Sequence, residues 1–284
     1  MLIIEDKNIL KETIQEIVAK KNKKIALIPT MGNIHDGHLS LIKAGMNHAN
    51  IIIVSIFVNP MQFNEEKDFI TYPRTLNQDY EILKKNNVNI VYVPHFKDIY
   101  PNGINEHTFI NVQSLSNILE GKSRPNHFYG VATIIAKLFN IIQPNLACFG
   151  EKDYQQLLLI RKMTLDLNYP IKIISVPIVR DINGLALSSR NKLLDEKEKK
   201  IANKINKILN NCAKKIENKI NTIQKIIEST KKELIKNKIK LDTIFIRNAQ
   251  NLNELNEKTK YAIILLSVRI GKIRLIDNKK IKLF

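Results

Sequence analysis

Two histidines, His35 and His38, lie three residues apart on either side of Gly37, directly after an apolar run over residues 25–28. The apolar run predicts a buried strand, and the apolar spacing after the histidines predicts a helix. The first turn of a helix favours anions, because its backbone N–H groups are unpaired and the helix dipole is positive there. The pattern therefore predicts a site for a nucleotide triphosphate. The alternative is a pair of histidines that only cap the helix.

Two polar segments further along the chain supply the cations that such a site needs. The chain has neither a loop ending in Gly-Lys-Ser/Thr nor a Gly-x-Gly-x-x-Gly fingerprint, which disfavours the usual kinase, NTPase and dehydrogenase templates. A histidine-based site suits chemistry at the α-phosphate with pyrophosphate leaving, and both phosphate groups then need positive charge nearby. Lys152 offers one charge, and Arg190 in the segment Ser188–Asn191 offers the other. Taken singly, Lys152 is equally a surface lysine, and Ser188–Arg190 is equally a capped turn.

Apolar runs with strand character alternate with amphipathic helical stretches over most of the chain. The run over residues 51–58 is apolar on both faces, as a central strand of a parallel sheet must be when helices cover it. The alternation predicts an α/β fold, a Rossmann-like doubly wound parallel sheet that binds ligands beyond the carboxyl ends of its strands. The expected strands are residues 25–28, 51–58, 90–93, 146–149 and 171–176.

The pattern changes after about residue 190, where two long lysine-rich helical segments precede three strand-like runs. We expect the runs over residues 241–246, 262–268 and 272–276 to form the sheet of a smaller C-terminal α+β domain. The predicted domains are residues 1–183, which carry the nucleotide site, and residues 184–284, which act as a lid. A short hinge is expected near Asn183–Gly184.

The net charge of +18 invites a nucleic-acid-binding interpretation. The lysines are spread through a chain that is equally rich in Ile and Asn, and the densest lysine stretches also carry regularly spaced Ile and Leu. These stretches therefore predict solvated helix faces, and no nucleic-acid partner is expected.

The two cysteines, Cys148 and Cys212, are far apart in sequence, so neither a disulfide framework nor a zinc site is predicted. Cys148 lies in an apolar run and is expected to be a small buried side chain. Charged residues near the N-terminus interrupt any signal core, and no later apolar run approaches membrane-spanning length. We expect a cytoplasmic protein without a membrane partner.

Six polar segments occur in a fixed order and span most of residues 24–194. They are Pro-Thr-Met-Gly-Asn-Ile-His-Asp-Gly-His-Leu-Ser (29–40), Phe-Val-Asn-Pro-Met-Gln-Phe (57–63), Tyr-Pro-Arg-Thr-Leu (72–76), Arg-Pro-Asn-His-Phe (124–128), Gly-Glu-Lys-Asp-Tyr-Gln-Gln (150–156) and Asp-Ile-Asn-Gly-Leu-Ala-Leu-Ser-Ser-Arg-Asn (181–191). Together they resemble the pantothenate synthetase family, also called pantoate–β-alanine ligases, within the superfamily of nucleotidyltransferases with a His-Ile-Gly-His-type motif. The resemblance implies a two-step reaction: ATP adenylates the carboxylate of (R)-pantoate with release of pyrophosphate, and the amine of β-alanine then displaces AMP to give pantothenate.

The resemblance also implies roles for individual residues. The expected catalytic residues are His35, His38, Lys152 and Arg190, with His38 as a possible proton donor. The ATP site would comprise Met31, Gly32, Asn33, Ile34, His35, Asp36, Gly37, His38, Gly150, Glu151, Lys152, Asp153, Val179, Leu187, Ser188, Ser189 and Arg190. Pantoate would be held by Gln62 and Gln156 with the support of Asn59, and Gln62 would also be near β-alanine. No metal cage of protein ligands is visible, so Mg²⁺ is expected to be held through the ATP phosphates. The family also implies a homodimer.

The chain departs from the family pattern at three positions. Asn126 stands where glycine is usual, Asn183 where an acidic residue is common, and Leu187 where methionine is common. The last change conserves volume and is expected to be nearly neutral. The first is expected to alter the loop near Arg124 and His127, which for that reason receive no role.

Two other functions remain open on the residues alone. One is a nucleotidyltransferase that shares the histidine site but leaves AMP on its product, so that analysis of the product separates it from the ligase. The other is a nucleic-acid-binding module that uses the charge of +18, for which a steep salt dependence without turnover would be diagnostic.

Overall fold

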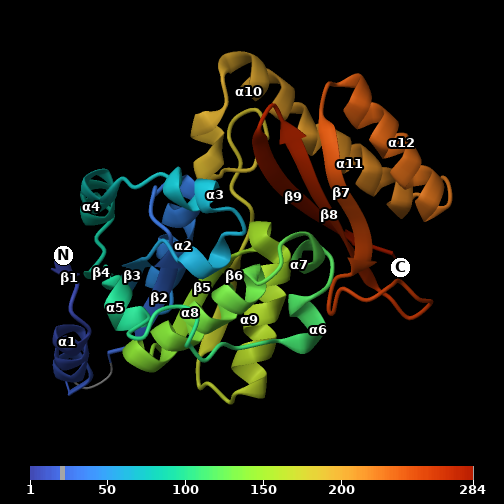
Figure 1. Ribbon diagram of the computed structural model, residues 1–284. Helices are drawn as coiled ribbons and strands as arrows, with labels where there is room; N and C mark the ends of the chain where they lie inside the picture. The colour runs from blue at the N-terminus through green and yellow to red at the C-terminus, as the bar shows by residue number, and fades with distance from the viewer. Residues whose placement is uncertain (20–22, 284) are drawn as a thin grey trace. The chain divides into compact units, whose positions relative to one another are not determined.

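The computed structural model describes residues 1–19 and 23–283, which fall into two compact units (Figure 1). The first unit consists of Met1–Glu151 and Gln155–Pro177. The second consists of Lys152–Tyr154 and the chain from Ile178 onward. The chain therefore passes between the units at three points, and a three-residue stretch belongs to the second unit although both of its neighbours in sequence belong to the first.

The first unit contains a six-stranded parallel sheet in the order β1-β4-β3-β2-β5-β6. Its strands are β1 (Leu2–Ile4), β2 (Ile25–Thr30), β3 (Ile51–Ile56), β4 (Ile90–Tyr92), β5 (Leu146–Gly150) and β6 (Lys172–Val176). The doubly wound fold and all five expected strands are confirmed. The sequence pattern did not predict β1, because its three residues are too few to show a period and two of them are exposed.

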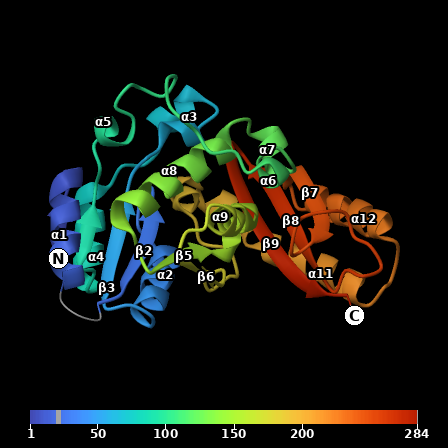
Figure 2. The ribbon, with the colours of Figure 1, turned by 90° about the horizontal axis from the view of Figure 1, so that it is seen from below.

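Helices cover both faces of this sheet (Figure 2). They are α1 (Lys7–Ala19), α2 (Asp36–Met46), η1 (Pro60–Gln62), α3 (Glu66–Ile70), α4 (Leu76–Lys85), α5 (Phe96–Ile99), α6 (Gln113–Ser116), α7 (Glu120–Ser123), α8 (His127–Ile142) and α9 (Tyr154–Asp166), the last preceded by η2 (Glu151–Asp153). The helices α2 and α4 pack with β2 and β3 in one hydrophobic cluster, and α8 covers the opposite face. Ile53 and Leu27 are fully buried between these layers. A strand that helices cover on both faces must be apolar on both sides, as these two central strands are.

Gly45 lets α2 lie very close to the sheet. A Cβ atom built on this glycine would stand 3.3 Å from Ala26 Cβ and 3.4 Å from Ile28 Cδ1. The close approach fixes the height of α2 above β2, and with it the position of the first turn of α2 at the end of that strand.

The second unit contains a three-stranded antiparallel sheet, β7-β8-β9, packed against helices. Its elements are η3 (Ser189–Leu193), α10 (Glu196–Ala202), α11 (Lys204–Glu217), α12 (Ile223–Lys236), β7 (Lys240–Asn248), β8 (Tyr261–Ile270) and β9 (Ile273–Lys282). The expected α+β character is confirmed. The prediction of two long helical segments was wrong in detail. Asn203 is the C-cap of α10 and Asn218 is the C-cap of α11, so the lysine-rich region is divided into α10, α11 and α12.

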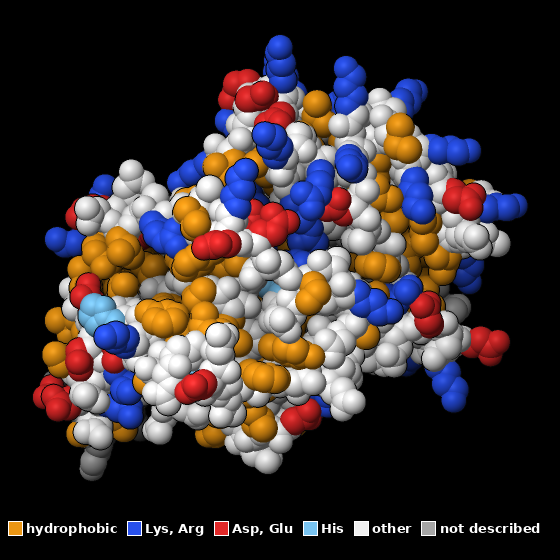
Figure 3. Space-filling view, in the orientation of Figure 1, with side chains coloured by type: hydrophobic (Ala, Val, Ile, Leu, Met, Phe, Trp, Pro, Cys, Tyr) orange, Lys and Arg blue, Asp and Glu red, His pale blue; other side chains and the backbone are white. Residues whose placement is uncertain are grey.

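The lysine-rich stretches of this unit are amphipathic, as predicted. Ile205, Ile208 and Leu209 of α11 are buried, whereas Lys204 and Lys207 are exposed. Figure 3 shows lysine and arginine side chains standing out separately over the region of α10 to α12, with other side chains between them. These charges therefore cover a solvated helix surface.

Cys148 on β5 is fully buried, as expected, and burial raises the pKa of its thiol to about 12. A thiol in this environment is inert at neutral pH.

Among the helices of the described residues, none is both long enough and apolar enough to span a membrane.

Candidate active site

The predicted site residues of the first unit follow three neighbouring strands. The histidine segment follows β2, Asn59–Gln62 follows β3, and Gly150 ends β5, with Gln156 in the first turns of α9. The order β3-β2-β5 places these strands side by side and parallel. Their carboxyl ends therefore share one edge of the sheet, where doubly wound folds bind ligands.

His35 and His38 together form a capping box at the N-terminus of α2. The Nδ1 atom of His35 accepts a hydrogen bond from the N–H of Gly37 (3.1 Å), and the N–H of His35 donates to Nδ1 of His38 (3.3 Å). The two rings lie 4.1 Å apart between centroids and are tilted by 31°. An Nδ1 atom that accepts a hydrogen bond carries no proton, so each neutral ring has its proton on Nε2. Capping thus fixes the tautomer in which Nε2–H is the donor that an anion would meet.

Asp79, in the first turn of α4, holds the turn that precedes the histidines. Its carboxylate is buried and accepts hydrogen bonds from the N–H groups of Asn33 (2.9 Å) and Ile34 (2.8 Å) and from the hydroxyl of Thr75. The turn needs this support, because Gly32 and Asn33 both have positive φ angles, of +78° and +53°. Sequence reasoning gave Asp79 no role; its position three residues after Tyr-Pro-Arg-Thr-Leu was the available signal.

Asn59 is fully buried, and its side-chain amide is used within the protein. Its Nδ2 atom donates to the carbonyl of Gly130 (3.0 Å), and its Oδ1 atom accepts from the hydroxyl of Tyr100 (2.7 Å) and the N–H of Met61 (3.3 Å). A Cβ atom on Gly130 would lie 2.7 Å from the backbone of Met61, so only glycine allows α8 to approach η1 this closely. Asn59 therefore acts by fixing η1, the helix that carries Gln62.

The backbone of Gln62 is held from a second direction by Arg124 and His127. The carbonyl of Gln62 accepts hydrogen bonds from Nδ1 of His127 (2.8 Å) and from the guanidinium of Arg124 (3.2 Å). Since His127 donates through Nδ1, its neutral ring is left to accept at Nε2, and Arg124 lies 3.0 Å from that atom. The segment Arg-Pro-Asn-His-Phe signalled both residues, but sequence reasoning assigned them no role.

The backbone conformation of Asn126, which lies between Arg124 and His127, explains why asparagine is tolerated where the family pattern has glycine. Its φ angle is +64°, in the left-handed region where glycine is favoured and asparagine is the best tolerated side chain. Asparagine therefore adopts here the conformation that glycine favours, and Arg124 and His127 both bind the carbonyl of Gln62.

The side-chain amides of Gln62 and Gln156 differ from those around them. Neither makes a hydrogen bond with any other residue that the structure describes, although Gln62 is buried and Gln156 is half-buried. Gln155 has the opposite character: its amide donates to the carbonyls of Leu115 (2.8 Å) and Ile118 (2.9 Å) and accepts from a backbone N–H. A buried amide that the protein leaves unused is suited to a polar ligand.

The remaining predicted residues belong to the second unit. Lys152 lies in η2 between the end of β5 and the start of α9, as expected; only 19% of its side chain is exposed, so it is no ordinary surface lysine. Ser188 does cap η3, its Oγ accepting from the N–H of Arg190 (3.2 Å). Val179 and Leu187 are joined by a backbone hydrogen bond of 2.9 Å, and this places their segments side by side.

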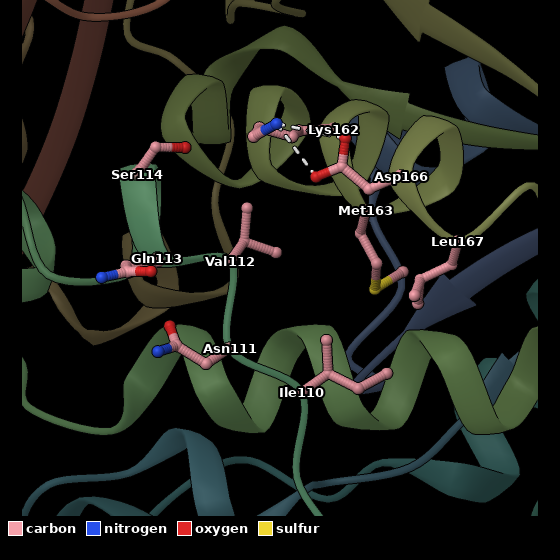
Figure 4. A pocket seen from close by; sticks show the side chains of 9 residues that line it. All are labelled: Ile110, Asn111, Val112, Gln113, Ser114, Lys162, Met163, Asp166 and Leu167. Atoms are coloured by element: carbon pink, nitrogen blue, oxygen red, sulfur yellow. Dashed lines mark hydrogen bonds and ion pairs between the residues drawn. The ribbon is translucent and has the colours of Figure 1, made fainter.

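A cavity of about 470 Å³ on the first unit contains none of the predicted residues (Figure 4). It is lined by the segment Ile110–Ser114 and by Lys162, Met163, Asp166 and Leu167 of α9 and its end. Lys162 pairs with Asp166 along α9, and four of the other lining side chains, Ile110, Val112, Met163 and Leu167, are apolar (Figure 4). This lining has no cation left for a phosphate, so we do not assign the cavity to the nucleotide.

The residue types of the predicted site are those that bind phosphate. Within residues 1–19 and 23–283, no group of three or more His, Cys, Asp or Glu side chains is arranged to hold a metal ion. Imidazole, ammonium, guanidinium and hydroxyl groups dominate the predicted set, and these donate to phosphate oxygens.

Comparison with known proteins bears on what this site does. The sequence profile described as pantoate-beta-alanine ligase matches residues 2–280. The structure is similar to the crystal structure of pantothenate synthetase from Thermus thermophilus, with 33% sequence identity, a TM-score of 0.89 and coverage of 98% of this chain and 99% of that chain. It is also similar to pantoate-beta-alanine ligase from Francisella tularensis, crystallised with beta-gamma ATP and β-alanine, with 40% identity, a TM-score of 0.83 and coverage of 98% and 97%.

We predict that Asp79→Asn loosens the histidine turn. An amide has one acceptor oxygen where the carboxylate has two, so one backbone N–H would face an NH₂ group and lose its partner. The unfolding free energy should fall by about 1–3 kcal/mol, and ATP should bind more weakly. Thermal unfolding and titration calorimetry measure the two effects. The control is Asp68→Asn on the exposed surface of α3; equal effects in both variants would contradict the assigned role.

Proposed function

The chain belongs to the pantoate–β-alanine ligase family, and from this premise we propose the part that its own residues take in the reaction. The protein is an ATP-dependent ligase that joins pantoate to β-alanine to form pantothenate. A carboxylate is a poor electrophile until it carries a good leaving group. The first step therefore places the pantoate carboxylate in line with the α-phosphate of ATP, and AMP then leaves when the β-alanine amine attacks the acyl adenylate.

The observation that carries the proposal is the capped pair His35 and His38 at the end of β2. Both rings have Nε2 as the protonated atom, set by hydrogen bonds at Nδ1. Two such donors on the first turn of α2, together with the N-terminal N–H group of Asp36, form an anion site for the ATP phosphates. We assign both histidines to stabilising negative charge on the phosphates. His38 serves in this way without transferring its proton.

Lys152 and Arg190 complete the positive charge. We propose that Lys152 contacts the α-phosphate, where charge increases in the transition state, and that Arg190 with Ser188 and Ser189 holds the departing β- and γ-phosphates. The rest of the proposed ATP site follows the family pattern: Met31, Gly32, Asn33, Ile34, Gly150, Glu151, Asp153, Val179 and Leu187.

Gln62 and Gln156 are the proposed pantoate clamps. Pantoate has two hydroxyls and a carboxylate, and an amide can both donate to and accept from such groups. That these two amides are unused by the described part of the protein supports the assignment. Asn59 supports the pocket through η1. We place the amine of β-alanine near Gln62, as the resemblance implies.

We further propose that Mg²⁺ arrives with ATP and is held through its phosphates. The donor groups of the proposed site suit phosphate oxygens, and a divalent cation on those oxygens would supply the charge neutralisation that the protein donors leave incomplete. A nucleotide domain over residues 1–183 and a lid domain over residues 184–284 also stay a proposal. The bending expected near Gly184 is not retained, because Asp181, Gly184 and Leu185 lie within one hydrogen-bonded hairpin of the second unit.

A homodimer located in the cytoplasm completes the proposed picture. Exposed apolar side chains support association with a second copy: Leu167, which lines the cavity of Figure 4, is 49% exposed, and Phe109 and Leu165, which are sequence neighbours of lining residues, are 53% and 77% exposed. A cytoplasmic location agrees with two cysteines that are buried and unpaired.

The test of the proposed function is isotope exchange. The purified protein is incubated with ATP, Mg²⁺ and labelled pyrophosphate, and incorporation of label into ATP is measured with and without (R)-pantoate. Exchange that requires pantoate demonstrates reversible adenylation of its carboxylate. Exchange that ignores pantoate, or its complete absence, would sink the proposed mechanism.

Two adjacent glutamines provide a matched pair for the pantoate site. Gln156→Ala should raise the KM for pantoate by about 10-fold or more while the melting temperature stays unchanged, because its amide binds nothing within the described protein. Gln155→Ala should instead lower the melting temperature, because its amide anchors the loop before α7. Steady-state kinetics measure the KM values for pantoate and ATP, and thermal unfolding measures the melting temperatures. If Gln156→Ala raised only the KM for ATP, the assignment of Gln156 to pantoate would be contradicted.

Lys152→Ala should act on the chemical step. A charge on the reacting phosphate counts most in the transition state, so kcat should fall by about 100- to 1,000-fold with a smaller change in the KM for pantoate. Lys172→Ala, at an exposed position on β6, is the control. An unchanged kcat in Lys152→Ala would remove the residue from the mechanism.

A further inference from the structure

Two adjacent residues of β9, Asp277 and Asn278, have buried polar side chains in the second unit. Only 4% of Asp277 and 6% of Asn278 is exposed. Burial of a carboxylate and an amide is costly unless each is hydrogen-bonded. Their partners therefore reveal what the strand holds in place.

The partner of Asp277 is Arg180. The two guanidinium nitrogens of Arg180 donate to the two carboxylate oxygens of Asp277, at 2.7 and 2.8 Å, in a two-pronged ion pair. Arg180 also donates to the carbonyl of Gly184 (3.1 Å). Such a fork fixes direction as well as distance.

Arg180 belongs to a small hairpin whose two ends are proposed ATP contacts. The carbonyl of Val179 accepts a hydrogen bond from the N–H of Leu187, and the N–H of Asp181 donates to the carbonyl of Leu185. Between these two pairs, Arg180 and Ala186 form an antiparallel β-bridge. The second arm of the hairpin continues directly into Ser188–Arg190, and η3 packs against β9. The ion pair to Asp277 therefore fixes the base of the segment that carries Arg190.

The partner of Asn278 is the backbone of Lys152. Its Nδ2 atom donates to the Lys152 carbonyl at 2.9 Å. Nearby, the hydroxyl of Tyr154 donates to the carbonyl of Ala249 at 2.8 Å, so the stretch Lys152–Tyr154 is anchored at both of its ends. All of these residues belong to the second unit.

We propose that Asp277 and Asn278 are positioning residues that hold Lys152 and the Val179–Arg190 segment in register with one another. The two residues are neighbours on one strand, so the spacing between the segments that they bind is set by β9 itself. The N–H of Asn278 also donates to Oδ1 of Asp277 (2.8 Å), which ties the two anchors together. The inference rests on the proposed function, because it concerns the lysine and arginine assigned there to the phosphates.

The reaction requires such a register. Lys152 is assigned to the α-phosphate and Arg190 to the β- and γ-phosphates. Because these phosphates are joined in one ATP molecule, the distance between the two cations must match the reach of its triphosphate. A displacement of about 1 Å between catalytic groups is enough to lower a rate by about 100-fold. Loss of either anchor should therefore reduce the chemical step and leave pantoate binding intact, because Gln62 and Gln156 lie in the first unit.

The test compares three variants of the full chain. Asp277→Asn removes the charge that pairs with Arg180, and Asn278→Leu keeps a similar volume without the donor to Lys152. The control is Asp242→Asn, which removes a carboxylate that pairs with Arg269 (3.1 Å) and Arg274 (3.5 Å) in the same sheet. Pantoate-dependent pyrophosphate exchange is measured for each folded variant, together with amide hydrogen exchange at Leu187.

We expect the exchange rate to fall by about 10- to 100-fold in Asp277→Asn and Asn278→Leu, with the KM for pantoate within about twofold of its original value. Asp242→Asn should keep the rate. The Leu187 amide should lose protection in Asp277→Asn alone. Full activity of either folded variant, or an equal loss in Asp242→Asn, would overturn the proposal.

Two further outcomes are also decisive. If Asp277→Asn does not fold, Arg180→Lys replaces it, because lysine keeps the charge and lacks the fork; an unchanged rate would overturn the proposal. If the unmodified protein shows no pantoate-dependent exchange, the proposed function fails. Protection at Leu187 then still reports whether Asp277 holds the hairpin.

Discussion

A polar group buried away from water must find a hydrogen-bond partner, and this requirement shapes the carboxyl edge of the first unit's sheet. Asp79 satisfies the backbone of the turn after β2, Asn59 joins η1 to α8, and Gln155 ties down the loop before α7. Each contact leaves one conformation for a loop that would otherwise have many. The side-chain amides of Gln62 and Gln156 stay unused within the described part of the protein, which is why we propose them for a ligand.

Features that depend on residues close together in the sequence could be predicted, and features that depend on contacts between distant residues could not. The central strands could be recognised because burial on both faces makes them continuously apolar, and the histidine turn because its residue types are rare together. Contacts across long separations were not recognisable: Asp79 is more than forty positions from the turn that it supports, and Arg124 is 62 positions from Gln62. Motifs at or beside these residues marked them as candidates, but nothing local in the sequence shows which distant backbone group such a carboxylate or guanidinium binds.

The two explanations offered for the histidine pair proved to be compatible. His35 and His38 do cap α2, and it is the capping that selects the tautomer with Nε2 protonated. Ser188 likewise caps η3 through its hydroxyl oxygen, and this hydrogen bond does not use the hydroxyl proton that we propose for a phosphate oxygen. A residue can therefore serve the local backbone and the chemistry at once, because a side chain with several donor and acceptor atoms can assign them to different tasks.

The three-residue stretch Lys152–Tyr154 belongs to the second unit while the chain on either side belongs to the first. No single cut can then separate the polypeptide into its two units, so expressing either half alone would leave the lysine without its anchor. During synthesis on the ribosome, Lys152 emerges long before Asn278. On our proposal that Asn278 positions Lys152, a nascent chain that has not yet made β9 contains every strand of the parallel sheet but lacks the anchor of the lysine.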